Sequence, residues 1–169
     1  MLFALAGLPG VGKTTLARAL AREVAAVHVR VDSIEQALRR AGWKVEGEGY
    51  EVAYAVAEDN LRVGRVVVAD CVNPWSLTRA AWRAVAERAG SSVLEVEVVC
   101  SDQAEHQRRV QARVADIPAL ALPSWSMILE RDYHAWTGAH LVVDTARLGV
   151  EEAVKTILSA STRPRDSAR

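Results

Sequence analysis

The sequence predicts one α/β domain built around a parallel β-sheet, and three observations lead to this prediction. Short apolar runs alternate with longer amphipathic segments along the chain, the pattern of strands joined by crossover helices. Residues 1–6 form a continuous apolar run that stops at Gly7, as expected of a central strand covered on both faces. A chain of 169 residues, half of them hydrophobic and a quarter charged, suits one folded domain.

Strands are expected where short apolar or β-branched runs end at a turn or a polar residue. The second and fourth runs are rich in valine, and the third contains three consecutive valines before Asp70. Helices between successive strands favour parallel pairing with right-handed crossovers. The predicted strands are residues 1–6, 27–31, 65–70, 93–99 and 141–143.

Helices are expected where apolar residues recur every three or four positions. In the first helix, for example, Leu16, Leu20 and Val24 fall on one face. Glycines in 42–49 mark a connection, and Pro118 and Pro123 bracket a loop. The predicted helices are residues 14–26, 33–41, 50–63, 76–89, 103–114, 124–136 and 150–159.

Composition and chain ends narrow the cellular setting and the partners. Residues 1–160 are expected to form the domain, and 161–169 a flexible polar tail. The N-terminal apolar run is too short for a membrane span, and Cys71 and Cys100 form no CxxC pair, which together favour a cytoplasmic protein without a membrane partner. The 21 basic and 21 acidic residues balance, which disfavours a nucleic-acid partner without excluding it.

A phosphate-binding loop lies between the first strand and the first helix. Gly-Leu-Pro-Gly-Val-Gly-Lys-Thr matches G-x-x-x-x-G-K-[ST] in full, in the strand-loop-helix context that gives this motif its meaning. The alternative, a glycine-rich turn with the same letters, is disfavoured by that context. Backbone N–H groups and the helix dipole would hold the phosphates of ATP. The residues assigned to nucleotide binding here are Gly7, Leu8, Pro9, Gly10, Val11, Gly12, Lys13, Thr14 and Thr15.

Lys13, Thr14 and Asp70 carry the expected nucleotide chemistry. Lys13 would contact the β and γ phosphates, and the Thr14 hydroxyl would ligate Mg²⁺. Asp70 ends an apolar strand in the manner of a Walker B aspartate and would hold the same ion. A strand that ends in aspartate is weak support alone, because aspartate also begins turns. The P-loop in the same chain favours the metal role.

Asp32 is expected to be the catalytic base and a substrate contact. It is predicted to end the second strand, at the sheet edge that carries ligand groups beside the P-loop. A carboxylate there could accept the proton of an attacking hydroxyl. The alternative is a capping box, because Glu35 follows Asp32 at the required spacing. The functional role is favoured, with the two roles in conflict only if the cap occupies the whole carboxylate.

Two further groups of residues are candidates for the site. Arg109 and Arg113 are spaced to share one face of a helix, where their guanidinium groups could contact ATP and stabilise the transition state; a solvated basic face is the alternative. Asn73 and Trp75 follow the third strand and could border an acceptor pocket, or they could form a proline turn with a packing tryptophan. The four histidines show no metal-ligand spacing.

Taken together, these stretches resemble the small P-loop kinases described as AAA-type ATP-binding proteins, relatives of chloramphenicol phosphotransferase, zeta toxins and polynucleotide 5′-hydroxyl kinases. The resemblance implies a three-layer P-loop NTPase fold, with a five-stranded parallel sheet in the order 2-3-1-4-5 and a small helical lid. It also implies that Arg109 and Arg113 are lid arginines, that Asp70 lies near metal and acceptor, and that the loop after Asp144 approaches adenine. The stretches that carry it are residues 7–14, 30–34, 67–74, 101–113, 123–133 and 141–145.

The chain departs from this family pattern at Glu35. Nucleoside monophosphate kinases have an arginine three residues after the equivalent aspartate, where it binds an anionic acceptor. A carboxylate at Glu35 would repel a phosphate, which favours a neutral or cationic acceptor. This argument depends on Glu35 not being occupied by a capping box.

The expected function is an ATP-dependent kinase that acts on a hydroxyl group of a small molecule, with ATP and Mg²⁺ as cofactors. The alternatives are a nucleotide or nucleic-acid 5′-hydroxyl kinase and a non-catalytic ATP-sensing module. The chain lacks the Asn-Lys-x-Asp motif of GTPases, and it is too short for the second domain of a mechanical AAA+ ATPase. Either a monomer or a homodimer is compatible with the sequence.

Overall fold

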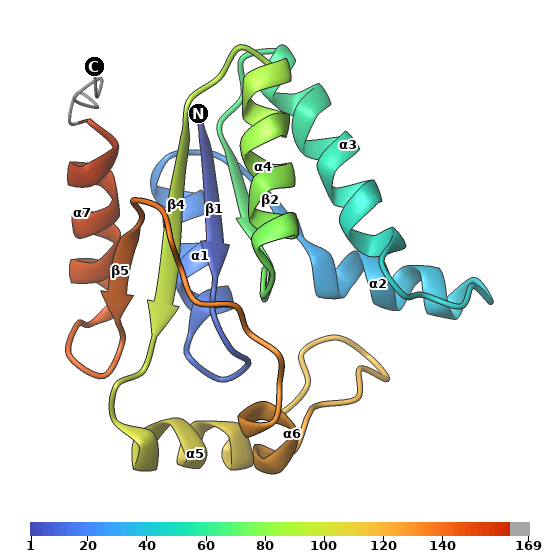
Figure 1. Ribbon diagram of the computed structural model, residues 1–169, viewed down its shortest axis with the longest axis vertical. Helices are drawn as coiled ribbons and strands as arrows, with labels where there is room; N and C mark the ends of the chain where they lie inside the picture. The colour runs from blue at the N-terminus through green and yellow to red at the C-terminus, as the bar shows by residue number, and fades with distance from the viewer. Residues whose placement is uncertain (163–169) are drawn as a thin grey trace.

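The computed structural model describes residues 1–162. A five-stranded parallel sheet forms the central layer, with helices on both faces (Figure 1). The strand order is β2-β3-β1-β4-β5, which confirms the predicted fold class. The strands are β1 (Leu2–Ala6), β2 (Val27–Arg30), β3 (Val67–Asp70), β4 (Val93–Val99) and β5 (Leu141–Asp144).

The carboxyl ends of β1, β2 and β3 lie side by side in the sheet. β1 lies between β3 and β4, and Leu5 of β1 is the partner of Asp70. Arg30 is in turn the partner of Asp70 across the β2–β3 pair. Every residue of β1 is buried, as the continuous apolar run predicted. The loop after β1 therefore begins beside the last residues of β2 and β3.

Two hydrophobic clusters attach helices to the two faces of the sheet: α3 (Glu48–Arg62) and α4 (Ser76–Arg88) to one face, α1 (Lys13–Glu23) and α7 (Val150–Ser161) to the other. On one face, α3 and α4 enclose fully buried Trp82, whose ring meets Tyr54 edge-on with 4.7 Å between ring centroids. On the other face, α1 and α7 pack Leu16, Leu20 and Ile157 against the strands. The helices of these layers are α1 (Lys13–Glu23), α2 (Val31–Arg40), α3 (Glu48–Arg62), α4 (Ser76–Arg88) and α7 (Val150–Ser161).

Two short helices lie beyond the carboxyl edge of the sheet. They are α5 (Gln103–Ala112) and α6 (Trp125–Leu129), and Figure 1 shows both below the tips of the strands. We call residues 103–129 the lid, and residues 114–123 within it the cleft loop. Asp102 caps α5 by accepting from the Glu105 N–H, and Ser124 caps α6 by accepting from the Met127 N–H.

The predicted helix 124–136 is wrong beyond Leu129. The following residues are instead fixed by the buried side chain of Arg79 on α4, which donates to the carbonyls of Asn73, Pro74, His134 and Ala135. The same guanidinium lies 4.0 Å from the centre of the Trp136 ring and 5.0 Å from that of Tyr133. Contacts with a distant arginine thus replace the helix that the local spacing predicted.

Other element boundaries differ less from the prediction. α2 begins at Val31, so Asp32 lies in its first turn rather than at the end of β2. α5 ends at Ala112, before Arg113. Ser161 is the last residue of α7 and not part of a tail, while residues 163–169 of the predicted tail lie outside the described residues. Within residues 1–162, no helix combines the length and apolar composition that a bilayer-spanning segment needs.

Candidate active site

The glycine-rich loop after β1 takes the form that the motif predicts. Gly7, Gly10 and Gly12 adopt φ values of 139°, 87° and 97°, which side chains rarely tolerate. A Cβ on Gly7 would lie 2.2 Å from the carbonyl oxygen of Val98 on β4. The loop therefore lies directly against the neighbouring strand, and α1 begins at Lys13 with its backbone N–H groups at the loop.

Lys13 is buried at the base of the loop. Its Nζ donates to the carbonyl of Leu8 at 2.8 Å, and the residue is 8% exposed. Burial lowers the pKa of Lys13 to about 8, although the negative charges of Asp70 and Asp32 oppose the shift. The two nearby carboxylates thus favour the cationic form of Lys13 against the effect of burial.

Asp70 ends β3 with a carboxylate that remains ionised in spite of its burial. It is 3% exposed, and its Oδ2 accepts from Nε2 of His28 at 3.2 Å. Burial raises the pKa of Asp70, but the His28 hydrogen bond and the charge of Lys13 outweigh it, so the net shift is downward. Hydrogen bonding from Thr14 contributes in the same direction. Asp70 and Thr14 therefore lie close together.

The oxygen atoms of Thr14 and Asp70 suit Mg²⁺, which prefers hydroxyl, carboxylate and phosphate oxygens. Within residues 1–162, no group of three His, Cys, Asp or Glu side chains is arranged to hold a metal ion. A magnesium ion at this position would therefore need oxygen ligands from a nucleotide as well. This is the usual arrangement when the ion arrives with a triphosphate.

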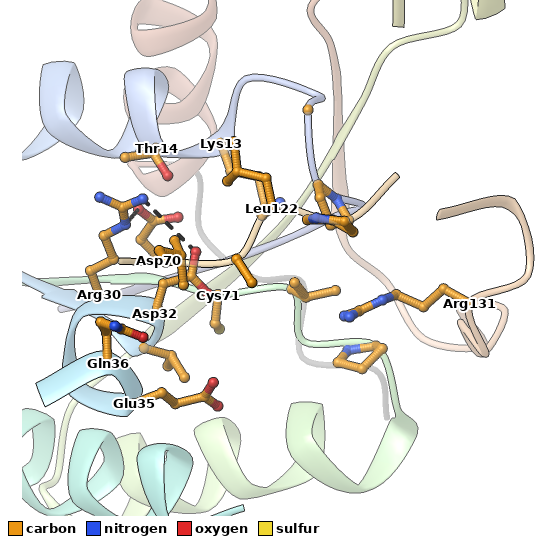
Figure 2. Close-up of a pocket in the computed structure, with 18 of the residues that line it drawn as sticks. Lys13, Thr14, Arg30, Asp32, Glu35, Gln36, Asp70, Cys71, Leu122 and Arg131 are labelled. Atoms are coloured by element: carbon orange, nitrogen blue, oxygen red, sulfur yellow. Dashed lines mark ion pairs between the residues drawn. The ribbon is translucent and has the colours of Figure 1, made fainter. Parts of the chain in front are cut away.

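Asp32 has an exposed carboxylate rather than a capping role. The N-cap residue of α2 is Arg30, and no side chain caps this helix, so the capping-box alternative is wrong. The Asp32 side chain is 39% exposed, and its Oδ2 lies 3.8 Å from Nη2 of Arg30. Asp32 and Asp70 line the same cleft. Figure 2 shows both beside the Arg30 guanidinium, with Lys13 and Thr14 on the adjoining wall.

Glu35 also lines the cleft, but it is not free of partners. Its Oε2 accepts from Nη2 of Arg39 at 2.9 Å, one turn along α2. Its stem fills the space in front of Gly49, where a Cβ would lie 2.2 Å from the Glu35 Cγ. The charge of Glu35 is therefore compensated within its own helix, which weakens the argument from this residue for a neutral or cationic acceptor.

The two arginines predicted to serve the site from the lid, Arg109 and Arg113, reach the cleft by different routes. Arg109 on α5 donates to Glu105 and to both the hydroxyl and the carbonyl of Thr145, whose hydroxyl donates to the Val11 carbonyl of the loop. Arg113 follows α5 in extended conformation, so the predicted shared helical face is wrong. Its charge nevertheless contributes to lowering the pKa of Lys13, which places it near the phosphate site.

Asn73 lies behind the wall of the cleft and does not border it, contrary to the prediction. Asn73 is fully buried, its φ is 48°, and its backbone N–H donates to the Tyr50 hydroxyl. Its side-chain amide has no hydrogen-bond partner within residues 1–162. Trp75, by contrast, does line the cleft, where its Nε1 donates to Asp132 at 2.9 Å.

One open cleft of about 1570 Å³ is lined by Lys13, Thr14, Asp32, Asp70 and Arg113, among others. Its volume exceeds the range of about 300–1,000 Å³ usual for one small ligand, which leaves room for a nucleotide and a second molecule. Sequence reasoning assigned no role to several residues that line it or lie beside it. Arg30 lies in residues 30–34, one of the stretches that carry the family resemblance, but no motif marks the other residues. These residues are Arg18, His28, Arg30, Tyr50 and Asp116.

The comparisons with known proteins agree with this geometry. The sequence profile of the family described as AAA domain matches residues 2–125, well over half of the chain. The chain belongs to this AAA domain family. The match spans the phosphate-binding loop, Asp32, Asp70 and the start of α6.

Solved structures similar to this AAA domain share its whole fold. The APS kinase CysC of Mycobacterium tuberculosis, in complex with AMPPNP and APS, is 18% identical with a TM-score of 0.72, covering 96% of this chain and 97% of its own. A gluconokinase from Sinorhizobium meliloti is 18% identical with a TM-score of 0.64, and the match covers 93% of this chain and 89% of the gluconokinase. Kti12 of Chaetomium thermophilum, in complex with ADP-AlF3, is 18% identical with a TM-score of 0.63, and the match covers 95% of this chain and 98% of Kti12. No curated protein matches the sequence.

The contrast between Gly7 and Gly12 gives a test of the loop geometry. We expect Gly7→Ala to lower the free energy of unfolding by about 3 kcal/mol or more, because its Cβ would meet a backbone carbonyl. The matched Gly12→Ala places its Cβ 3.5 Å from the nearest atom and should cost only about 1 to 2 kcal/mol of backbone strain. Urea unfolding without nucleotide measures both, and equal losses would contradict the close approach to β4.

Proposed function

We propose that this protein is a kinase that transfers the γ-phosphoryl group of ATP to a hydroxyl group of a small molecule. The observation that carries the proposal is the placement of an exposed carboxylate, Asp32, in the same cleft as Lys13 and Asp70. A phosphate site alone would suit any nucleotide-binding module. A solvent-accessible base beside it suits transfer to an acceptor.

In this mechanism the chain contributes positioning, charge and a proton acceptor. The loop N–H groups and Lys13 hold the phosphates, and Arg113 approaches the transferred group from the lid side. The acceptor oxygen attacks the γ-phosphorus, the bond to the β-phosphate oxygen breaks, and ADP leaves. The hydroxyl proton passes to Asp32. Thr14 and Asp70 would hold Mg²⁺, which when bound neutralises phosphate charge.

The structures named above support the same proposal without identifying the acceptor. One was solved with AMPPNP and APS, and another is a gluconokinase. Their acceptors differ, so the shared fold supports phosphoryl transfer more than it supports a particular substrate. The acceptor is therefore defined only as a small molecule that carries a hydroxyl group.

The direct test is ADP release from Mg-ATP in the presence of candidate acceptors. The panel contains hydroxyl-bearing antibiotics, sugars, sugar acids, nucleosides and 5′-hydroxyl oligonucleotides, with Lys13→Ala as the inactive control. Acceptor-dependent ADP release that Lys13→Ala abolishes would establish the kinase. ATP binding without stimulation by any acceptor would favour a sensing module, and stimulation by oligonucleotides alone would favour a nucleic-acid kinase.

The role of Asp32 is tested by Asp32→Asn. We expect this change to leave ATP affinity within about twofold and to reduce phosphoryl transfer by about 10² or more, because the amide cannot accept the proton. Glu51→Gln serves as the control, since Glu51 is an exposed acid at the cleft on α3 and carries no assigned role. Unchanged transfer in Asp32→Asn would remove Asp32 from the mechanism.

The lowered pKa of Lys13 predicts how ATP binding depends on pH. With a pKa of about 8, Lys13 loses its charge above this pH in the free protein, whereas bound phosphates favour the charged form. ATP affinity should therefore be highest below pH 8 and fall by up to about tenfold per pH unit above it, as one proton is taken up on binding.

Calorimetry in buffers of different ionisation enthalpy measures both the affinity and the proton uptake. Lys13→Arg is the control, because a guanidinium stays charged throughout this range. An affinity that is independent of pH in the unmodified protein would contradict the buried, shifted lysine.

A further inference from the structure

The cleft loop places a carboxylate on the acceptor side of the cleft, against two arginines. Asp116 Oδ2 accepts from Nη1 of Arg30 at 2.7 Å and from Nη2 of Arg18 at 2.6 Å. Its Oδ1 accepts from Nη2 of Arg30 at 3.0 Å. The pair of bonds from Arg30 is bidentate, the geometry in which a guanidinium recognises carboxylate, phosphate or sulfate groups.

Arg30 is a buried cation that needs an anion in front of it. Its side chain is only 5% exposed, and a buried charge is costly unless it is paired and hydrogen-bonded. Asp32 and Asp70 lie 3.8 Å away, beyond hydrogen-bond distance. Within residues 1–162, Asp116 is the carboxylate that hydrogen-bonds to Arg30, and the Arg30 Nε has no partner. The cation thus belongs to the cleft wall, but its hydrogen-bonded partner belongs to the lid.

The cleft loop is held on the cleft mainly through this contact. Asp116 makes three hydrogen bonds to the cleft wall. Within residues 1–162, one further hydrogen bond joins the loop to residues outside the lid: Gln36 Nε2 donates to the Pro118 carbonyl at 3.2 Å. The hydrogen bonds from Arg30 and Arg18 hold the pKa of Asp116 well below its usual range. Asp116 therefore stays ionised near neutral pH, and protonation does not release the loop.

We propose that Arg18 and Arg30 form an anion-binding subsite for a carboxylate, phosphate or sulfate group of the acceptor, and that Asp116 is an internal stand-in which this group displaces. Both arginines line the cleft on the side of Asp32, which is the proposed base. Arg18 follows Thr14 by one turn of α1, so it extends from the phosphate site toward the acceptor. The acceptor is then a hydroxyl compound that also carries an anionic group.

The assignment of the anion to the acceptor rests on the proposed function, but anion binding does not require turnover. Inorganic sulfate is the probe, titrated by calorimetry into protein saturated with Mg-AMPPNP, with sodium chloride at matched ionic strength as the blank. The nucleotide analogue fills the phosphate-binding loop through its γ position. Sulfate that binds under these conditions occupies a separate subsite, whereas sulfate that binds only with Mg-ADP occupies the γ-phosphate position and overturns the proposal.

Asp116→Asn tests the stand-in. Removing its charge should tighten sulfate binding about tenfold, because a larger fraction of the protein has the subsite open. Glu130→Gln is the matched control: it removes the same charge from an exposed residue just after α6, and no arginine within residues 1–162 pairs with it. It should change sulfate affinity by less than about twofold. Equal effects of the two changes would mean a general charge effect and would overturn the proposal.

Removal of each arginine in the Asp116→Asn background identifies the ligands. Arg18→Gln, at a side chain that is 46% exposed, should weaken sulfate binding about tenfold without loss of fold, and Arg30→Gln should weaken it further. Sulfate affinity that is unchanged in Arg18→Gln would overturn the subsite even if Arg30→Gln fails to fold. In the unmodified protein, sulfate should also accelerate amide hydrogen exchange in residues 114–123, and sulfate binding without faster exchange would show that Asp116 is not displaced.

Discussion

The burial of one guanidinium, that of Arg30, constrains how the parts of the cleft fit together. Its position at the end of β2 places a positive charge where three strands end side by side. That charge is surrounded by carboxylates from three other elements: Asp70 of β3, Asp32 of α2 and Asp116 of the cleft loop. Without Arg30, these acids would repel one another, and Asp116 would keep only its pairing with Arg18. The acceptor side of the cleft therefore depends on this buried cation.

Local sequence patterns were sufficient for the sheet and the phosphate-binding loop. The strands and the loop are encoded by contiguous residues, such as the apolar run before Gly7 and the Gly-Lys-Thr that opens α1. The order of the strands came from family resemblance, because crossover rules alone permit several orders. The carboxylates Asp32 and Asp70 were likewise found because each lies close to a strand end.

Features that depend on distant contacts were not predictable in the same way. Arg30 and Asp116 are 86 positions apart, and nothing around Asp116 forms a recognisable pattern. The helix predicted to continue through Trp136 fails because Arg79, more than fifty positions earlier, binds its backbone carbonyls. Asn73 was misplaced for a related reason: its left-handed backbone turns it inward beneath Tyr50, a conformation that the sequence Asn-Pro did not reveal.

The attachment of α5 to the phosphate-binding loop is separate from the attachment of the cleft loop to the acceptor side. His106 donates from Nε2 to the Pro9 carbonyl at 2.8 Å, and Val110 lies so close to Gly10 that a Cβ there would come within 2.5 Å of it. α5 is therefore held against the loop, and the cleft loop begins only after Arg113, where the helix has ended and the backbone is extended. The cleft loop reaches the acceptor side of the cleft through Asp116. The proposed displacement of Asp116 from Arg18 and Arg30 therefore leaves the contact of His106 with the phosphate-binding loop intact, and the two ligands need not bind in a fixed order.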